Sequence, residues 1–211
     1  MNHCAPLNIL AIGPHPDDIE IGCGGTMAKY AANGHHVYFF VASDGAAGGD
    51  PAIRRAEQEH SCRLINAAGL FWGDLTDTQI QIEKITIQKI EQIIQLTKPD
   101  LIFVNHHDDT HQDHRHIAAL TYSATRYIRN VLMYETPTTS NFNPSVFVDI
   151  GESFLKVKIE TLQAHASQIN RTNIANLSII DVARSAALFR GVQARVTHAE
   201  AFQSLRLFLT I

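Results

Sequence analysis

The sequence lacks any apolar run close to the roughly 18 residues that a membrane-spanning helix needs, so no membrane span is expected. Its first residues, MNHCAPLNIL, lack the basic stretch and long apolar core of a signal peptide, and a cytoplasmic location is therefore expected. Cysteine is scarce as well. Cys4, Cys23 and Cys62 show no CxxC spacing, and they are interpreted as packing residues of a protein in a reducing compartment.

Clustered positive charge is also missing. The 17 Lys and Arg residues are outnumbered by 21 Asp and Glu residues, which gives a formal net charge of −4. Arg54 and Arg55 form a basic cluster too small for nucleic-acid binding, which needs a broad positive surface, so no nucleic-acid partner is expected. Histidine, in contrast, is abundant, with 12 in all and a dense group in residues 106–116.

Short apolar runs alternate with longer amphipathic segments, which predicts an α/β fold with a Rossmann-like, mostly parallel sheet and helices on both faces. With 211 residues and no repeat or linker, residues 1–211 are expected to form a single domain. Strands are predicted at 7–12, 37–42, 70–72, 101–104, 131–134 and 146–150. Helices are predicted at 22–32, 53–68, 80–97, 114–129, 153–168 and 179–193, and the segment from Ala199 onward is left unassigned.

Polar residues directly follow the first, second and fourth predicted strands. In an open parallel sheet, ligands bind beyond the carboxyl ends of the strands, where these loops meet. The first loop, within GPHPDDIEIGCGG, crowds three carboxylates beside one imidazole, and such carboxylates repel one another unless protons or a cation hold them together. His15 and Asp18 can turn to one side at the start of the helix, while Asp17 points elsewhere. A simple helix cap is the alternative, but a cap needs only one acid.

The loop after the fourth strand, NHHDDTHQDH, offers a second set of ligand-type side chains in His111, Asp113 and His114. A His/Asp/His set drawn from both loops would occupy three positions of a catalytic zinc ion and leave one open for water, whose pKa zinc lowers to about 7. Such ligands also accept other divalent ions, such as Fe²⁺.

Metal-assisted hydrolysis also requires a base and a group that donates to the oxyanion or the leaving group. Asp17 suits the base, and His111 suits the opposing donor. Asp113 would hold the His111 ring in one tautomer and keep it protonated.

Several motifs of this chain resemble those of the LmbE-like, or PIG-L, family of zinc-dependent N-acetylglucosaminyl deacetylases. The two metal motifs are PHPDDIE followed by GCGGT, and HQDHR; the supporting segments are SDGAAGGD, RRAE, YETP, FVDIG, HASQ and AEAF, so that the likeness covers nearly the whole chain. Two positions depart from the family pattern: Gln112 replaces the more usual proline, and His198 replaces an aromatic residue.

The resemblance implies an enzyme that removes an N-acyl group, in particular N-acetyl, from an amino-sugar conjugate such as a GlcNAc derivative. It implies a homo-oligomer with zinc on His15, Asp18 and His114, with Asp17 as the base and His111 oriented by Asp113. It also puts Arg54 near the family's substrate-binding arginine. Asp44, in the loop after the second strand, is the other predicted substrate contact.

Two other functions stay open. Gly22, Gly24 and Gly25, with Asp44 downstream, fit a nucleotide-binding turn, although the carboxylates before them would repel a pyrophosphate. The glycines are instead expected to let the first helix approach the sheet. A metal-dependent phosphoesterase would share the metal and the base, but it would need more positive charge near the site. Structural roles are expected for a further group of acids and histidines: Glu20, His106, His107, His116, His165 and His198.

Overall fold

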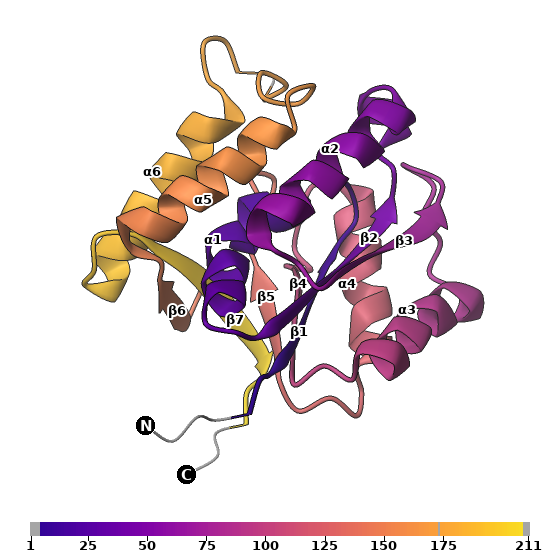
Figure 1. The fold of residues 1–211 in the computed structure, drawn as a ribbon. Helices are drawn as coiled ribbons and strands as arrows, with labels where there is room; N and C mark the ends of the chain where they lie inside the picture. Colours follow the sequence, from indigo (N-terminus) through magenta and orange to yellow (C-terminus); the bar gives the residue numbers. More distant parts are fainter. Residues whose placement is uncertain (1–4, 173, 209–211) are drawn as a thin grey trace.

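The computed structural model describes residues 5–172 and 174–208, so Cys4 lies outside the described residues. Within this part, the chain forms one seven-stranded sheet with helices on both faces (Figure 1). The strands are β1 (Asn8–Gly13), β2 (His36–Ser43), β3 (Gly69–Leu75), β4 (Leu101–Asn105), β5 (Val131–Tyr134), β6 (Val146–Asp149) and β7 (Ala199–Arg206). The helices are α1 (Asp18–Ala32), α2 (Pro51–Ile65), α3 (Lys84–Thr97), α4 (Gln112–Ala124), α5 (Gly151–Ala164) and α6 (Ile179–Ala194), with a 3₁₀ turn at Ala46–Gly48.

The strand order is β3-β2-β1-β4-β5-β7-β6, which confirms the predicted α/β fold with a mostly parallel sheet. Strands β1 to β5 pair in parallel, whereas β7 pairs antiparallel with both β5 and β6. β7 is the segment that the sequence left unassigned. Because β1 pairs with β2 on one side and β4 on the other, the loops after β1 and β4 meet at a topological switch point, where open α/β sheets bind ligands.

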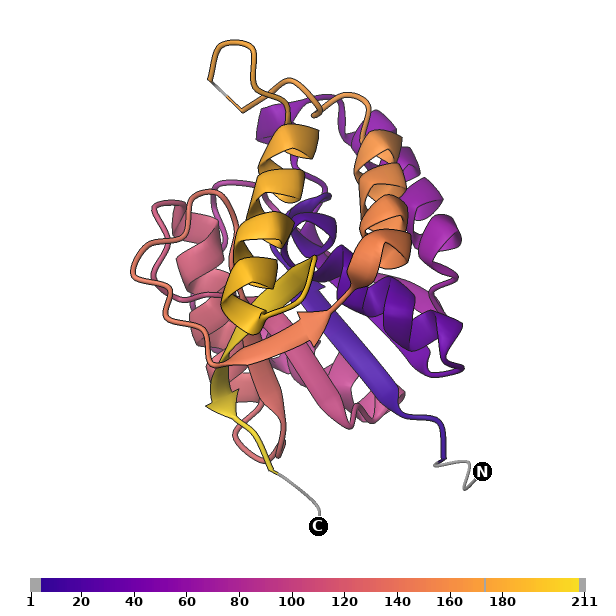
Figure 2. The ribbon, with the colours of Figure 1, turned by 90° about the vertical axis from the view of Figure 1, so that its left-hand side faces the viewer.

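Successive side chains of β1 point to opposite faces of the sheet and pack into two separate apolar clusters. Ile9 and Ala11 pack with α1 and α2, and Leu10 and Ile12 pack with α3 and α4, which cover the opposite face in Figure 1. Cys23 and Cys62 belong to the first cluster, which confirms their role as packing residues. Helices α5 and α6 lie side by side, as Figure 2 shows, and share a third apolar cluster. Among the described helices, none combines the length and apolar character that crossing a bilayer requires.

Helix boundaries differ from the predictions mainly at their ends. α1 begins at Asp18 instead of residue 22 and is kinked at Cys23, where φ is −145°. α3 begins at Lys84 instead of residue 80, and α4 ends at Ala124 instead of residue 129. Residues 80–83 continue an apolar pattern without helical geometry, since Ile80 is buried in the core from a loop. The early start of α1 matters most, because it brings Asp18 onto the first helical turn.

Gly22 and Gly25 of α1 are packing positions, as expected, whereas Gly24 is not. A Cβ placed on Gly22 would overlap the ring of Tyr134 in β5, and a Cβ on Gly25 would lie 3.0 Å from Ile150. Gly22 therefore lets α1 lie directly on the sheet. This packing role accounts for Gly22 and Gly25 without a bound nucleotide.

We predict that Gly22→Ala lowers the free energy of unfolding by about 2 kcal/mol or more, because the new methyl group has no room against the Tyr134 ring. Gly24→Ala is the matched control on the same helix. Its Cβ would meet nothing closer than 3.6 Å, so this variant should be unchanged or about 0.5–1 kcal/mol more stable. Urea denaturation of both variants measures the difference, and equal stabilities would contradict the packing role of Gly22.

Candidate metal centre and active site

A cavity of about 900 Å³ opens at the carboxyl ends of β1 and β4. Its floor carries the polar residues of two loops: His15, Asp17 and Asp18 around the start of α1, and His111 and His114 around the start of α4. The fold thus brings together side chains that are almost 100 residues apart in sequence. Ligand pockets commonly have volumes of about 300–1,000 Å³, so the cavity is large enough for a sugar.

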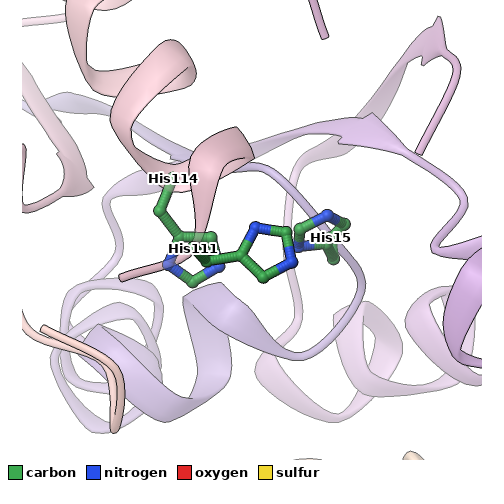
Figure 3. A group of neighbouring side chains, drawn as sticks. All are labelled: His15, His111 and His114. Atoms are coloured by element: carbon green, nitrogen blue, oxygen red, sulfur yellow. The ribbon is translucent and has the colours of Figure 1, made fainter. Parts of the chain in front are cut away.

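Three imidazoles converge at the cavity floor. The ring centroids of His15 and His111 are 4.8 Å apart, and those of His111 and His114 are 4.9 Å apart. Figure 3 shows His111 and His114 extending from the start of α4 toward His15. One ligand atom from each of these three residues lies within 4.8 Å of the other two. The expected proximity of His15 and His114 is therefore present, with ring centroids 5.6 Å apart.

Asp18 lies between two of these imidazoles. Its Oδ2 is 3.1 Å from Nδ1 of His15 and 3.3 Å from Nε2 of His114. A tetrahedral zinc site with bonds of 2.0–2.1 Å separates its ligand atoms by about 3.3 Å, and each of the two Asp18 distances is close to that value. Among the described residues, two groups have ligand atoms that all lie within 4.8 Å of one another: His15 with His111 and His114, and His15 with Asp77 and Asp113. Asp18 approaches His15 and His114 separately, so the third ligand beside these two imidazoles is either Asp18 or His111.

The outer nitrogens of the same imidazoles face carboxylates. Nε2 of His15 lies 3.0 Å from Oδ1 of Asp77 and 3.2 Å from Oδ2 of Asp113. Nδ1 of His114 lies 3.1 Å from Oδ2 of Asp109. Histidines that bind metals commonly have a carboxylate on the second ring nitrogen, which fixes the tautomer and orients the ring. Asp77 was not among the predicted site residues, because the third strand was expected to end at residue 72, before it reached this edge.

Asp109 is the carboxylate that faces His114, a contact that its position in the sequence did not predict. Its Oδ2 accepts hydrogen bonds from Oγ1 of Thr136, at 2.9 Å, and Oγ1 of Thr139, at 3.0 Å, in addition to facing His114. Two threonines from the segment after β5 therefore hold the carboxylate that orients His114. The loop after β4 was recognised as a site loop, but no spacing rule distinguished Asp109 from its neighbour Asp108.

The predicted pairing of Asp113 with His111 is not the one observed. The Asp113 carboxylate accepts from the backbone N–H of Thr78, at 2.7 Å, and faces His15. Instead of contacting the carboxylate, Nδ1 of His111 accepts the backbone N–H of Asp113, at 3.2 Å, and so caps α4. Burial and the neighbouring His15 and His114 lower the pKa of His111, so the prediction of a protonated His111 is not supported. The reason is that the first turn of α4 directs Asp113 toward the loop after β3.

Asp17 combines an unusual backbone with an altered acidity. Its φ of 92° lies in the left-handed region, which is strained for a residue other than glycine. Burial and the adjacent Asp18 raise the pKa of Asp17 to about 6, although Arg54 and His165 act in the opposite direction. A carboxylate with a pKa near neutrality is well suited to accept a proton at physiological pH.

The two predicted substrate contacts have different positions. Arg54 lines the cavity, and its guanidinium donates to the backbone oxygens of Gly45, at 2.8 Å, and Pro16, at 2.7 Å. Asp44 does not line the cavity. Its carboxylate lies 3.6 Å from Nε of Arg55, so this placement does not support a contact between Asp44 and substrate.

The acids and histidines expected to be structural lie outside the cavity lining. Glu20 is fully buried, and its Oε1 lies 3.6 Å from Nε2 of the buried His165. Burial alone would raise the pKa of Glu20, but His165 and the Ser61 hydroxyl hold the pKa of Glu20 below its usual value. His198 lies 3.5 Å from Glu152. The remaining three contact a backbone group or a tyrosine: His106, His107 and His116.

The profile of the PIG-L family, described as GlcNAc-PI de-N-acetylase, matches residues 10–125, more than half of the chain. The chain therefore belongs to the PIG-L, or LmbE-like, family. The matched region begins within β1 and contains β2 to β4, with both loops of the metal centre.

Individual relatives make the comparison more specific. The chain is 34% identical over 167 residues to the "Uncharacterized deacetylase YaiS" of Escherichia coli K12, covering 75% of this chain and 90% of that protein. It superposes on the N,N'-diacetylchitobiose deacetylase of Pyrococcus horikoshii with a TM-score of 0.82 and 25% identity, covering 93% of this chain and 83% of that one. A 4-carboxy-2-hydroxymuconate hydratase, GalB of Pseudomonas putida KT2440, has the same fold, with a TM-score of 0.82, 20% identity and coverage of 96% and 98%.

We predict that the metal-free protein loses stability as the pH rises from about 6.5 to 9. Burial alone would lower the pKa of His114, but Asp18 and Asp109 raise it from 6.5 to about 9 in the folded protein. A raised histidine pKa stabilises the folded state below the unfolded pKa, and this contribution disappears as the pH passes the folded pKa. The loss should be about 3 kcal/mol. Urea denaturation with a chelator present measures it.

The His114→Asn variant is the control for this pH dependence, since it removes the titrating group. Its free energy of unfolding should change less over the same pH range. A wild-type apoprotein with constant stability between pH 6.5 and 9 would show that His114 does not hold an extra proton.

Proposed function

We propose that this protein is a metal-dependent N-deacetylase that removes the acetyl group from the 2-amino group of a GlcNAc-type sugar. The observation that carries the proposal is the position of Asp17, a carboxylate next to Asp18 in the chain, which lines the same cavity as His15 and His114. The family and the relatives named as deacetylases support the same reaction.

We assign the metal to His15, Asp18 and His114, with zinc as the preferred ion. We favour Asp18 over His111 as the third metal ligand, because Oδ2 of Asp18 is close to ligand nitrogens of both His15 and His114. Asp77 and Asp113 would orient His15, and Asp109 would orient His114. When bound, the ion would supply Lewis-acid chemistry, making a water more acidic and polarising the acyl oxygen.

Asp17 takes the proton of the attacking water, and this proton is then available to the departing amine. His111 acts on the opposite side. Because its Nδ1 accepts the backbone N–H of Asp113, the proton of the neutral ring is on Nε2, which makes Nε2 a hydrogen-bond donor. A neutral imidazole that donates to the developing oxyanion is consistent with the lowered pKa of His111.

The cavity walls favour a neutral, hydroxyl-rich substrate. Side-chain amides and hydroxyls line the rim, at Thr138, Gln168, Asn170 and Thr172. Two arginines line the cavity, Arg54 and Arg171, and the charge of Arg54 is opposed by Asp17, whose Oδ2 lies 3.4 Å from the guanidinium. Arg54 donates to two backbone carbonyls, and Arg115 donates to the backbone oxygens of Asp109 and Thr110. We therefore favour an acetylated sugar over a phosphate ester, with Arg54 as the cationic group nearest the substrate.

A homo-oligomer and a cytoplasmic location stay predictions from the sequence. The experiment that tests the function is a screen for release of free amine from N-acetylglucosamine, diacetylchitobiose and GlcNAc conjugates, with and without chelator. We expect turnover of at least one substrate that stops when the metal is removed and returns with zinc. Phosphate esters and an unsaturated dicarboxylic acid serve as comparison substrates, and preferential turnover of either would reject the deacetylase assignment.

We predict that Asp17→Asn retains its metal and lowers kcat by roughly 10²- to 10⁴-fold, because the amide cannot accept the proton. Asp74→Asn, an exposed aspartate paired with Arg55, is the matched control and should leave kcat unchanged. The free-amine assay, together with metal analysis, makes the comparison. Normal turnover by the Asp17 variant would exclude Asp17 as the base.

Metal affinity distinguishes the two candidate ligand triplets. We predict that Asp18→Asn weakens zinc binding by more than the roughly 10- to 100-fold that loss of an outer orienting partner costs. Asp77→Asn should fall within that 10- to 100-fold range, and His111→Asn should bind zinc almost as well as the wild type. Competition with a fluorescent chelator measures all three affinities. If the His111 variant loses the metal while the Asp18 variant keeps it, His111 is the third ligand.

A further inference from the structure

A buried polar cluster lies directly behind Asp17, outside the cavity lining. It consists of Glu20 on α1 and Gln58 and Ser61 on α2, and all three side chains have an exposure of 0%. None of these residues belongs to the metal centre or to the steps assigned above. Buried polar groups are costly unless they are hydrogen-bonded, so the partners of this cluster show what it does.

Gln58 is the centre of the cluster. Its Nε2 donates to Oε1 of Glu20, at 2.6 Å, and lies 3.7 Å from Sγ of Cys62. Its Oε1 accepts the backbone N–H of Asp17, at 3.3 Å. The Ser61 hydroxyl donates to the same Glu20 oxygen, at 2.6 Å. The amide of Gln58 therefore links the Glu20 carboxylate to the backbone of Asp17.

The carboxylate determines which way this amide faces. A glutamine side chain can present either its oxygen or its NH₂ group to a given neighbour, and the two orientations have nearly the same shape. An ionised carboxylate only accepts hydrogen bonds, so the NH₂ group of Gln58 must face Glu20. The carbonyl oxygen then faces Asp17, where a backbone N–H is available.

Asp17 needs such support because its backbone is strained. Its left-handed φ of 92° persists only where the surroundings hold it. On its carbonyl side, the oxygen of Asp17 accepts the N–H of Ile21 in the first turn of α1, at 2.9 Å. On its amide side, Gln58 supplies the hydrogen bond. Both sides of the strained residue are therefore fixed, and its side chain is directed toward the cavity floor.

We propose that Gln58, oriented by Glu20, is a positioning residue that holds the general base Asp17 in its strained, reactive conformation. The proposal rests on the proposed function only for the role of Asp17 as the base. The backbone geometry of Asp17 can be observed without any measurement of activity. The alternative is that the cluster merely joins α1 to α2. In that case, removing any of its hydrogen bonds would have the same effect.

Two variants, Gln58→Met and Ser61→Ala, test whether Gln58 positions Asp17 or whether the cluster only joins α1 to α2. Methionine has a similar length but cannot hydrogen-bond the Asp17 N–H, whereas Ser61→Ala removes a buried hydrogen bond to the same Glu20 oxygen and leaves the Gln58 contact intact. We expect kcat of Gln58→Met to fall at least tenfold, with KM within twofold of the wild type and an unchanged zinc content. Ser61→Ala should show a comparable decrease in Tm and a kcat within twofold of the wild type.

Crystal structures of the wild type and the Gln58 variant provide a readout that is independent of activity. We expect the φ of Asp17 to leave the left-handed region, or its carboxylate to turn away from the cavity, in Gln58→Met. If this variant does not fold, Glu20→Gln replaces it, since a neutral amide at position 20 allows Gln58 to turn around. An unchanged Asp17 together with a normal kcat, or equal losses of kcat in the Gln58 and Ser61 variants, would overturn the proposal. A wild-type protein without deacetylase activity would reject the proposed function. The φ of Asp17 in the two crystal structures would still show whether Gln58 positions this residue.

Discussion

The structure of the site depends on buried carboxylates and imidazoles that balance one another. Asp18, Asp113 and His114 are each less than a tenth exposed, and isolated charges at such positions would be strongly destabilising. This arrangement is stable because the imidazoles of His15 and His114 each face carboxylates on both ring nitrogens. In the metal-free protein the balance is maintained by protons on His15 and His114, because, against the effect of burial, the neighbouring carboxylates raise the pKa values of both imidazoles. A divalent cation would take the place of these protons, which is the physical link between the fold and a metal-dependent reaction.

The metal-binding loops were the most predictable part of this chain. Histidine and aspartate at fixed spacings directly after predicted strands are typical of metal sites, and the parallel order of β1 and β4 brings these strand ends together. The outer partners were much harder to predict. Asp77 belongs to a loop whose strand was predicted too short, and Asp113 faces His15 only because of the direction of the first turn of α4. Contacts of this kind depend on how helices and loops pack in three dimensions, and a single sequence does not contain that information in any regular spacing.

The fold predictions show the same distinction. Strands β1 to β5 have apolar runs between turn signals, and they were found within a few residues of their observed limits. β7 was not identified as a strand, because its buried half contains Glu200, which forms an ion pair with the buried Lys158 and accepts two backbone N–H groups of α1. A charged residue in a buried strand interrupts the pattern on which sequence prediction depends. The fold by itself does not specify the reaction either, since a hydratase shares it, so the side chains at the floor of the cavity must determine the chemistry.

The position of β7 also affects how the protein can be synthesised. Because β7 lies between β5 and β6, the outer edge of β5 has no neighbour until residue 206 has left the ribosome. The five parallel strands and both metal-binding loops precede that point, so the nascent chain can assemble a nearly complete sheet that still has an open edge. Unpaired edges readily add strands from other molecules. The open edge of β5 therefore exposes the nascent chain to misassociation during translation of its last third, until β7 pairs with β5 and β6.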